Sequence, residues 1–255
     1  MGGNRFAYFS LPVSKIVLGT CSLPMFATIF CVVWSVAFDF ERSTATHCKV
    51  YNFLPSISSA IGGFAPQRYV WRICVSIHCT QRFMVGVAYY NFHTSVYPGA
   101  TNKKYKALAA LNSLLHLVEI FSLVCLSMIS STENGGVHEG FFISFIISGL
   151  LYMLVTIVLL HWGRFSNGKI PTTQERMSLS YKTRLFLFKI FVFAVAAYLF
   201  YRHNAYCEPY VYSWFAALEY VVVFTNIFFH ATLYWDLEDF NLALVHKDLI
   251  SSHHS

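Results

Sequence analysis

The side chains best suited to catalysis are a histidine and a carboxylate, which lie one helical turn apart in an apolar run. His116 and Glu119 fall on one face of a helix expected over residues 107–130, and Asn112 shares that face. A carboxylate that orients an imidazole is a common form of general base. The same two side chains could equally form a structural hydrogen bond. The spacing makes His116 and Glu119 the candidate catalytic pair.

Two other apolar runs also carry a polar stripe. At 100° per residue, a basic stripe within about 120° of arc on residues 69–92 contains Arg68, Arg72, His78, Cys79 and Arg82. On residues 210–235 a stripe within about 40° contains Tyr212, Glu219, Asn226 and His230. Ionisable groups at membrane depth must face protein or water. These faces either neutralise one another as buried ion pairs or line a polar cavity for a charged headgroup.

A phosphate-bearing lipid is a chemically sensible ligand for such a cavity, because guanidinium groups match phosphate by bidentate hydrogen bonding. Arg68, Arg72, Arg202 and His203 are expected to gather near one membrane surface. Lys189, one turn inside the opposite end of its helix, is expected to extend toward the interface. The substrate-binding candidates are His47, Arg68, Arg72, His78, Arg82, Arg202, His203, Glu219, Asn226 and His230.

Composition indicates which elements must position these residues. The chain has 255 residues, of which 56% are hydrophobic and 12% charged, about half the charged share of soluble domains. This excludes a disordered chain and argues against an ordinary cytosolic enzyme. The net charge of +6 sits mostly in short segments between apolar runs, which favours membrane topology over nucleic-acid binding.

Six apolar runs predict an all-α polytopic membrane bundle of six transmembrane helices. A spanning helix needs about 20 apolar residues. The run over residues 69–92 is the most polar, and we count it as spanning because its omission would put neighbouring loops on the wrong sides. The expected spans cover residues 16–38, 69–92, 107–130, 140–162, 185–201 and 210–235.

Lysine and arginine positions predict the orientation. With the N-terminus in the cytosol, eleven of these residues fall in cytosolic segments and three in the opposite loops. Both termini are then cytosolic, with an N-terminal segment over residues 1–15, a six-helix domain over 16–235 and a tail over 236–255. The luminal loop over residues 39–68 is too apolar for disorder and is expected to pack across the luminal mouth. The basic loop over 163–184 is expected near anionic headgroups.

The cysteines predict one disulfide. Cys48 and Cys207 both fall in expected luminal loops, where disulfides form, although two free thiols are the alternative. The other five cysteines lie in spans and are expected to pack there. Zinc-type spacing is missing and the histidines are scattered, so the sequence predicts neither a metal site nor an evident cofactor.

Four stretches carry a family resemblance. They are residues 44–48 (TATHC), 53–63 (FLPSISSAIGG), 66–72 (PQRYVWR) and 202–208 (RHNAYCE). The chain resembles the post-GPI-attachment-to-proteins factor two family, within the wider Frag/DRAM/Sfk group, over roughly residues 16–240.

The resemblance implies remodelling of the lipid of GPI anchors in the Golgi membrane, with the endoplasmic reticulum as a second possible location. In that family the lyso-GPI intermediate is reacylated at sn-2 with a saturated chain, by the family member as catalyst or as an essential subunit. The implied partners are GPI-anchored proteins, lyso-GPI and membrane lipid, with no nucleic acid and no identified protein partner. The acyl donor could be acyl-CoA or a phospholipid. The alternatives are a noncatalytic lipid-presenting factor and a small transporter or channel.

Overall fold

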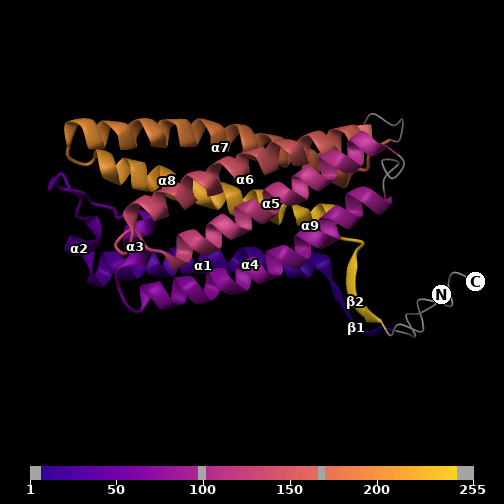
Figure 1. Cartoon of the computed structure of the whole chain (residues 1–255), viewed down its shortest axis with the longest axis horizontal. Coiled ribbons are helices and arrows are strands. Elements are labelled where there is room, and N and C mark those ends of the chain that lie inside the picture. Colours follow the sequence, from indigo (N-terminus) through magenta and orange to yellow (C-terminus); the bar gives the residue numbers. More distant parts are fainter. Residues whose placement is uncertain (1–6, 97–101, 166–169, 246–255) are drawn as a thin grey trace, which may run out of the picture.

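The structure, a computed structural model, describes residues 7–96, 102–165 and 170–245, which form a bundle of six long helices (Figure 1). Short elements lie at its two ends. In chain order the elements are β1 (Ala7–Pro12), α1 (Val13–Phe38), α2 (Phe40–Thr44), α3 (Ile57–Gly62), α4 (Gln67–Asn91), η1 (Phe92–Val96), α5 (Lys103–Met128), α6 (Gly135–Phe165), α7 (Thr173–Tyr206), α8 (Val211–Ala231), α9 (Leu233–Asp236) and β2 (Asn241–Val245).

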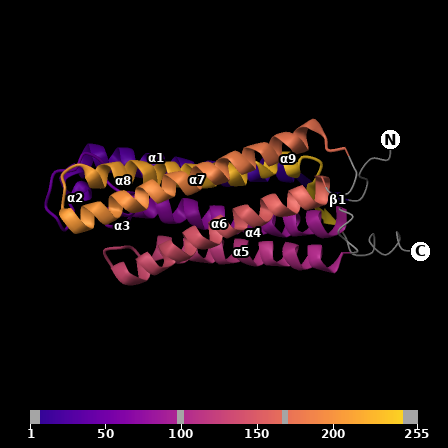
Figure 2. The same cartoon turned by 90° about the horizontal axis from the view of Figure 1, so that it is seen from above.

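The long helices pack as three antiparallel pairs: α1 with α4, α5 with α6, and α7 with α8. Contacts of α4 with α5, α6 with α7 and α1 with α8 join the pairs. One end carries α2, α3, the α5–α6 loop and the α7–α8 turn, and we call it the lid end (Figures 1 and 2). At the other end β1 pairs antiparallel with β2, with Leu11 opposite Leu242, so the first and last described strands lie together at this ribbon end.

The bundle turns large apolar side chains outward and ionisable ones inward. Phe26, Leu114 and Phe191 are 57%, 57% and 67% exposed, whereas Glu119 and Lys189 are 0% exposed. Water would penalise such a surface and lipid would not, which fits a multi-pass membrane protein.

Five of the long helices are long and apolar enough to cross a membrane. They are α1, α5, α6, α7 and α8, and α4 stands apart because it carries Arg68, Arg72 and Arg82. The all-α membrane bundle is therefore confirmed. The count of six crossings and the cytosolic termini stay predictions, with which the six helices and the shared ribbon end are compatible.

One expectation about a loop was wrong. The basic segment over residues 163–184 is not a loop throughout its length, because α7 already begins at Thr173. A capping box stabilises this start: the Thr172 side chain accepts from the Glu175 backbone N–H, and the Glu175 side chain accepts from the Thr172 backbone N–H. Most of the run from Ser58 to Gly63 forms α3, whose N-cap is Ser56.

The loop between α1 and α4 is folded onto the bundle, as expected for a mouth-covering segment; we call residues 39–66 the lid segment. Ile57, Ala60 and Ile61 of α3 are buried, and the Ala60 carbonyl accepts from the Ser35 hydroxyl of α1 at 3.1 Å. A side chain on Gly62 would meet Ser130 Cβ at 3.2 Å, so this glycine permits close approach of α3 to the α5–α6 loop.

Candidate functional site

A cluster of charged and polar side chains lies in the centre of the bundle. We call it the charge cluster, and it comprises Arg82, His116, Glu119, Lys189, Asn226 and His230, from four helices. Arg82 Nη2 lies 2.8 Å from Glu119 Oε2 and 2.7 Å from His230 Nε2. Glu119 Oε1 accepts from Asn226 Nδ2 at 2.9 Å. The polar stripes of the second, third and sixth long helices therefore converge, as the sequence predicted.

Lys189 belongs to this cluster, which corrects the expectation that it extends to the interface. Its side chain is 0% exposed and donates to Asn226 Oδ1 at 2.6 Å. Snorkelling fails because Lys189 faces α8 rather than lipid, and a buried ammonium needs a partner. Two cations, Arg82 and Lys189, thus lie around the single carboxylate of the cluster.

Two glycines lie next to the cluster, and one of them makes room for it. A side chain on Gly86 of α4 would place Cβ 2.8 Å from His116 Cδ2, closer than real Cβ atoms come. A side chain on Gly149 of α6 would meet Glu119 Oε1 at 3.4 Å and Lys189 Nζ at 3.5 Å, which is ordinary contact. Gly86 is therefore the position where a small residue is required.

The candidate pair His116 and Glu119 lies in the cluster, but the described hydrogen bonds of Glu119 go elsewhere. Glu119 is held by Arg82, Asn226 and His230. The His116 ring lies by Arg82, with Nδ1 3.4 Å from Nη2 and Nε2 3.3 Å from the backbone oxygen. The catalytic role stays a prediction, and the geometry favours the alternative of a buried ion-pair network.

The donor atoms of His116, Glu119 and His230 lie within 4.8 Å of one another, a spacing that a metal ion could use. The guanidinium of Arg82 already lies among them, 2.7–3.4 Å from all three side chains. A fixed cation on the chain thus satisfies the donor set, and we assign no metal to it.

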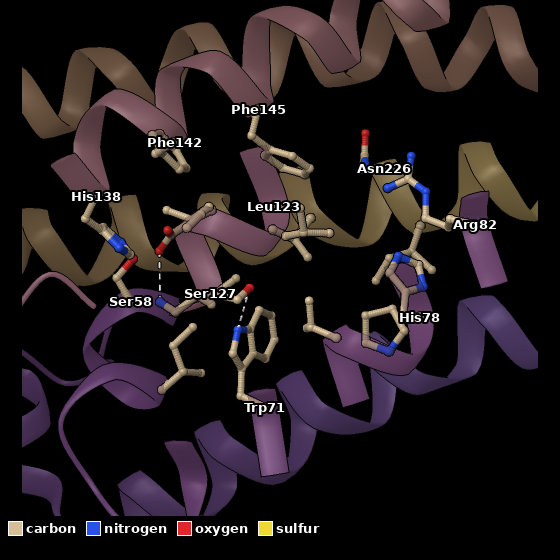
Figure 3. A pocket seen from close by; sticks show the side chains of 18 of the residues that line it. Ser58, Trp71, His78, Arg82, Leu123, Ser127, His138, Phe142, Phe145 and Asn226 are labelled. Atoms are coloured by element: carbon tan, nitrogen blue, oxygen red, sulfur yellow. Dashed lines mark hydrogen bonds between the residues drawn. The ribbon is translucent and has the colours of Figure 1, made fainter. Parts of the chain in front are cut away.

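An interior cavity lies beside the cluster, between α1, α3, α4, α5, α6 and α8 (Figure 3). The space that the centre of a water-sized sphere can occupy in this cavity is about 60 Å³. On the same measure, a cavity that holds one water molecule needs roughly 10–15 Å³. Its wall is largely apolar, with side chains such as Trp71, Leu123 and Phe145. The polar side chains in its lining are Ser58, His78, Arg82, Ser127, His138, Glu219, Asn226 and His230.

Most polar groups of this cavity lie at its two ends (Figure 3). Arg82, His78 and Asn226 lie at the end nearer the bundle centre, and the His78 ring Nδ1 is 2.6 Å from the Thr20 carbonyl oxygen. Ser58 of the lid segment and His138 lie together at the other end. Between the two ends, the Ser127 hydroxyl accepts from the Trp71 indole N–H at 3.1 Å. A largely apolar wall between two polar ends suits part of an amphiphilic molecule.

Glu219 holds the lid segment over this cavity. Its Oε2 accepts from the Ile57 backbone N–H at 2.9 Å, at the start of α3. Ser213 of α8 accepts from the backbone N–H groups of Phe53 at 2.8 Å and Leu54 at 3.2 Å. The FLPSISSAIGG stretch is therefore the part of the lid segment that docks on α8. The contacts of Glu219 are structural, and its role in substrate binding stays a prediction.

The disulfide between Cys48 and Cys207 is confirmed, with the two Cα atoms 5.3 Å apart. It ties the lid segment to the α7–α8 turn. His47 and His203 flank it, with ring centroids 5.6 Å apart. Four of the other cysteines are buried and Cys125 is partly buried.

Each of the remaining arginine candidates has a local partner among the described residues. Arg72 donates to the Met128 carbonyl at 2.7 Å and pairs with Glu133 at 3.4 Å, at the α5–α6 loop. Arg202 pairs with Glu208 at the α7–α8 turn. Arg68 lies over the ring of Tyr69. The shared phosphate cluster of Arg68, Arg72, Arg202 and His203 stays a prediction.

Sequence reasoning missed Ser58 and His138 of the cavity. His138 lies in the first turns of α6, before the apolar run begins, and the sequence analysis counted it among the scattered histidines. Ser58 lies inside one of the four stretches that carry the family resemblance, but it was not among the candidate site residues. A histidine followed by the apolar positions Phe142 and Phe145 on one helical face is the signal that could have found it.

Comparisons with known proteins identify the family. Residues 12–240 match the family model described as Frag1/DRAM/Sfk1/Cwh43P N-terminal domain. A Xenopus tropicalis protein named Acyltransferase PGAP2 is 44% identical over 236 residues, which is 92% of each chain. Drosophila melanogaster Post-GPI attachment to proteins factor 2 is 40% identical over 235 residues, covering 92% of this chain and 89% of that protein.

A third relative, Post-GPI attachment to proteins factor 2 of Caenorhabditis elegans, is 37% identical over 238 residues, covering 92% of this chain and 89% of its own. No solved structure matches the chain. Full-length similarity at this level, with a family model that spans the whole bundle, establishes that the chain belongs to the Frag1/DRAM/Sfk1/Cwh43P N-terminal domain family.

Proposed function

We propose that this protein acts in GPI-anchor remodelling and reacylates lyso-GPI at sn-2 with a saturated acyl chain, in the Golgi membrane. The names of the relatives, Acyltransferase PGAP2 and Post-GPI attachment to proteins factor 2, support a role in the processing of GPI anchors. Its partners are then lyso-GPI and GPI-anchored proteins, and its acyl donor is a phospholipid or acyl-CoA.

The observation that carries the proposal is the interior cavity with polar groups at both ends. Its volume of about 60 Å³ corresponds to several water-sized groups. That is room for an ester group and its first methylenes, but not for a whole lipid. A buried site of this kind excludes water from an acyl group, which favours transfer to an alcohol over hydrolysis.

The test is reconstitution of the purified full-length chain in nanodiscs with lyso-GPI. One arm supplies phosphatidylcholine with a deuterated stearoyl chain, and the other supplies deuterated stearoyl-CoA. Mass spectrometry should detect deuterated diacyl GPI in one of the two arms. Empty nanodiscs are the control.

One observation favours a noncatalytic lipid-presenting role as a second candidate. The general-base pair that the sequence predicts, His116 and Glu119, is tied into an ion-pair network by Arg82, and neither residue lines the cavity. Saturable binding of lyso-GPI without transfer in either arm would support this role. Absence of both binding and transfer would contradict both candidates.

A further inference from the structure

Ser58 and His138 form a hydrogen-bonded pair at the lid end of the cavity (Figure 3). Ser58 Oγ lies 2.9 Å from His138 Nε2. The other ring nitrogen, Nδ1, lies 2.7 Å from the carbonyl oxygen of Ile129. A carbonyl oxygen only accepts, so Nδ1 of the neutral ring carries the proton and Nε2 accepts from the Ser58 hydroxyl. This is the arrangement of an activated nucleophile, a base and a group that orients the base.

Three separate elements hold the pair in place. Ser58 lies on α3, His138 on α6, and Ile129 ends α5. His138 is 7% exposed, whereas Ser58 is partly accessible. The pair thus has a buried base beside a hydroxyl that a bound molecule can reach.

A purely structural hydrogen bond between the lid segment and α6 would have the same length. Two observations indicate more than a structural role. Both side chains line the cavity, together with the apolar Trp71 and Phe142. The neighbouring hydroxyls of Ser56 and Ser59 bond to each other at 3.0 Å and to no imidazole in the described ranges, so Ser58 is chemically distinct from them.

We infer that Ser58 is the nucleophile, and His138 the general base, of a two-step acyl transfer that passes through an acyl-Ser58 ester. This deepens the proposed function and rests on it for the identity of the acceptor. The donor class is a long-chain acyl ester, either the oxyester of a glycerophospholipid or a thioester.

In the first step Ser58 Oγ bonds to the acyl carbonyl carbon and its proton passes to His138 Nε2. The bond from that carbon to the donor's oxygen or sulfur breaks, and the leaving group departs as an alcohol or thiol with the proton from His138. In the second step the sn-2 hydroxyl of lyso-GPI gives its proton to His138 and bonds to the acyl carbon. The acyl bond to Ser58 breaks and Ser58 Oγ takes the proton back.

The experiment separates this chemistry from the overall reaction by omitting the acceptor. The full-length protein in nanodiscs is incubated with deuterated stearoyl phosphatidylcholine in one arm and deuterated stearoyl-CoA in the other. It is then quenched in acid, and the peptide with residues 53–63 is analysed by fragmentation mass spectrometry. We expect a deuterated stearoyl adduct on Ser58 in the arm with the true donor.

Variants define the role of each group. Ser58→Ala should abolish the adduct, and Ser59→Ala, the matched neighbour, should leave it unchanged. His138→Ala should lower the rate of adduct formation at least 100-fold, within the usual range for a general base, and added imidazole should restore part of it. Ser58→Cys keeps a nucleophile of similar size and should give an adduct that neutral hydroxylamine removes.

Each outcome has a distinct meaning. Full transfer to lyso-GPI by folded Ser58→Ala overturns the inference and leaves the proposed function in place. An adduct on Ser58 without transfer to lyso-GPI supports the inference and overturns the proposed acceptor. If Ser58→Ala does not fold, failure of folded Ser58→Cys to form a hydroxylamine-sensitive adduct overturns the inference.

Discussion

At the residue scale, the charge cluster has one carboxylate, Glu119, among buried cations. Glu119 pairs with Arg82 at 2.8 Å, and Lys189 reaches the same group through Asn226. Removal of one partner from a buried pair leaves an uncompensated charge, whereas removal of an exposed partner leaves a charge that water solvates. The buried and the exposed ion pairs of this chain therefore contribute differently to the free energy of unfolding.

Glu119→Ala should destabilise the protein by about 3–5 kcal/mol, the usual cost of an unpaired buried charge. The measurement is the thermal unfolding midpoint of the purified protein in detergent. Glu133→Ala is the control, because the Glu133 side chain is 49% exposed where it pairs with Arg72, and its midpoint should barely change. Equal midpoints for both variants would contradict the proposed role of the charge cluster in stability.

The pKa of Glu133, at the lid end, lies below its ordinary value. Hydrogen bonds from the Ser130 backbone and hydroxyl, and then the charge of Arg72, lower the pKa of Glu133. A carboxyl with a lowered pKa in the folded state stabilises above its unfolded pKa and loses this effect as the pH falls through the folded pKa. The contact between Arg72 and the α5–α6 loop should accordingly be complete at neutral pH.

Gly86→Ala should destabilise the protein by about 1–3 kcal/mol through overpacking. The new Cβ would lie 2.8 Å from His116 Cδ2, so the His116 ring must move away from Arg82. Gly19→Ala is the control, since nothing lies within 4 Å of its added Cβ, and alanine should there gain up to about 1 kcal/mol of helix propensity. Opposite signs of the two shifts in unfolding midpoint are expected.

At the element scale, the lid segment covers one end of the cavity and is fixed to the α7–α8 pair. The disulfide, Glu219 and Ser213 fix the lid segment to the turn and helix of the α7–α8 pair. The outer faces of the same helices carry large apolar side chains that lipid covers. The same substitution made once on the inner face and once on the outer face of one helix can therefore distinguish an effect on activity from an effect on folding.

Cys48→Ser should lower the free energy of unfolding by about 2–5 kcal/mol, as for loss of other native disulfides. The bridge joins positions 159 residues apart, so its loss frees the lid segment from the α7–α8 turn. The unfolding midpoint in detergent without reductant measures this. Cys125→Ser, at a partly buried free thiol, is the matched control and should leave the midpoint close to that of the parent chain.

Leu123→Phe should reduce acyl transfer at least tenfold, because a larger ring fills a cavity of about 60 Å³ that Leu123 lines. Leu117→Phe makes the same change on the outer face of α5, where Leu117 is 43% exposed, and should leave transfer unchanged. The reconstituted transfer assay provides the measurement. Equal rates for the two variants would show that this cavity does not hold the reacting group.

At the scale of the whole molecule, β1 and β2, the first and last described elements, pair at one end of the bundle. An even number of crossings would produce this arrangement in a membrane. The Lys and Arg distribution predicts that this end is cytosolic. The disulfide then lies on the luminal side, where disulfides form.

Cysteine labelling can test this orientation. Ser131→Cys and Thr173→Cys introduce thiols at two exposed positions toward opposite ends of the bundle, Ser131 in the α5–α6 loop and Thr173 at the start of α7. In sealed microsomal vesicles with the cytosolic face outward, an impermeant maleimide should label Thr173→Cys directly. It should label Ser131→Cys only after permeabilisation. The reverse pattern would invert the topology, and direct labelling of both would contradict a bundle that spans the membrane.

The sequence by itself determined the class of the molecule and the number of long helices, and it predicted the disulfide with two free thiols as the alternative. These follow from local properties: an apolar run long enough to cross a bilayer is visible in composition, and Cys48 and Cys207 fall between such runs. The polar stripes on three helices also predicted which faces meet, because burial of ionisable groups in lipid is too costly to occur without partners.

Only the tertiary structure decided which partner each polar residue has. Glu119 bonds to Arg82 rather than forming a pair with His116, Lys189 turns inward, and three arginines of the lid end engage different neighbours. Ser58 and His138, 80 positions apart, meet only because α3 folds back over the start of α6. Helix periodicity fixes the direction in which each side chain leaves the axis of its helix. The rotation of each helix about that axis, and its position along the axis relative to its neighbours, depend on packing across the whole bundle.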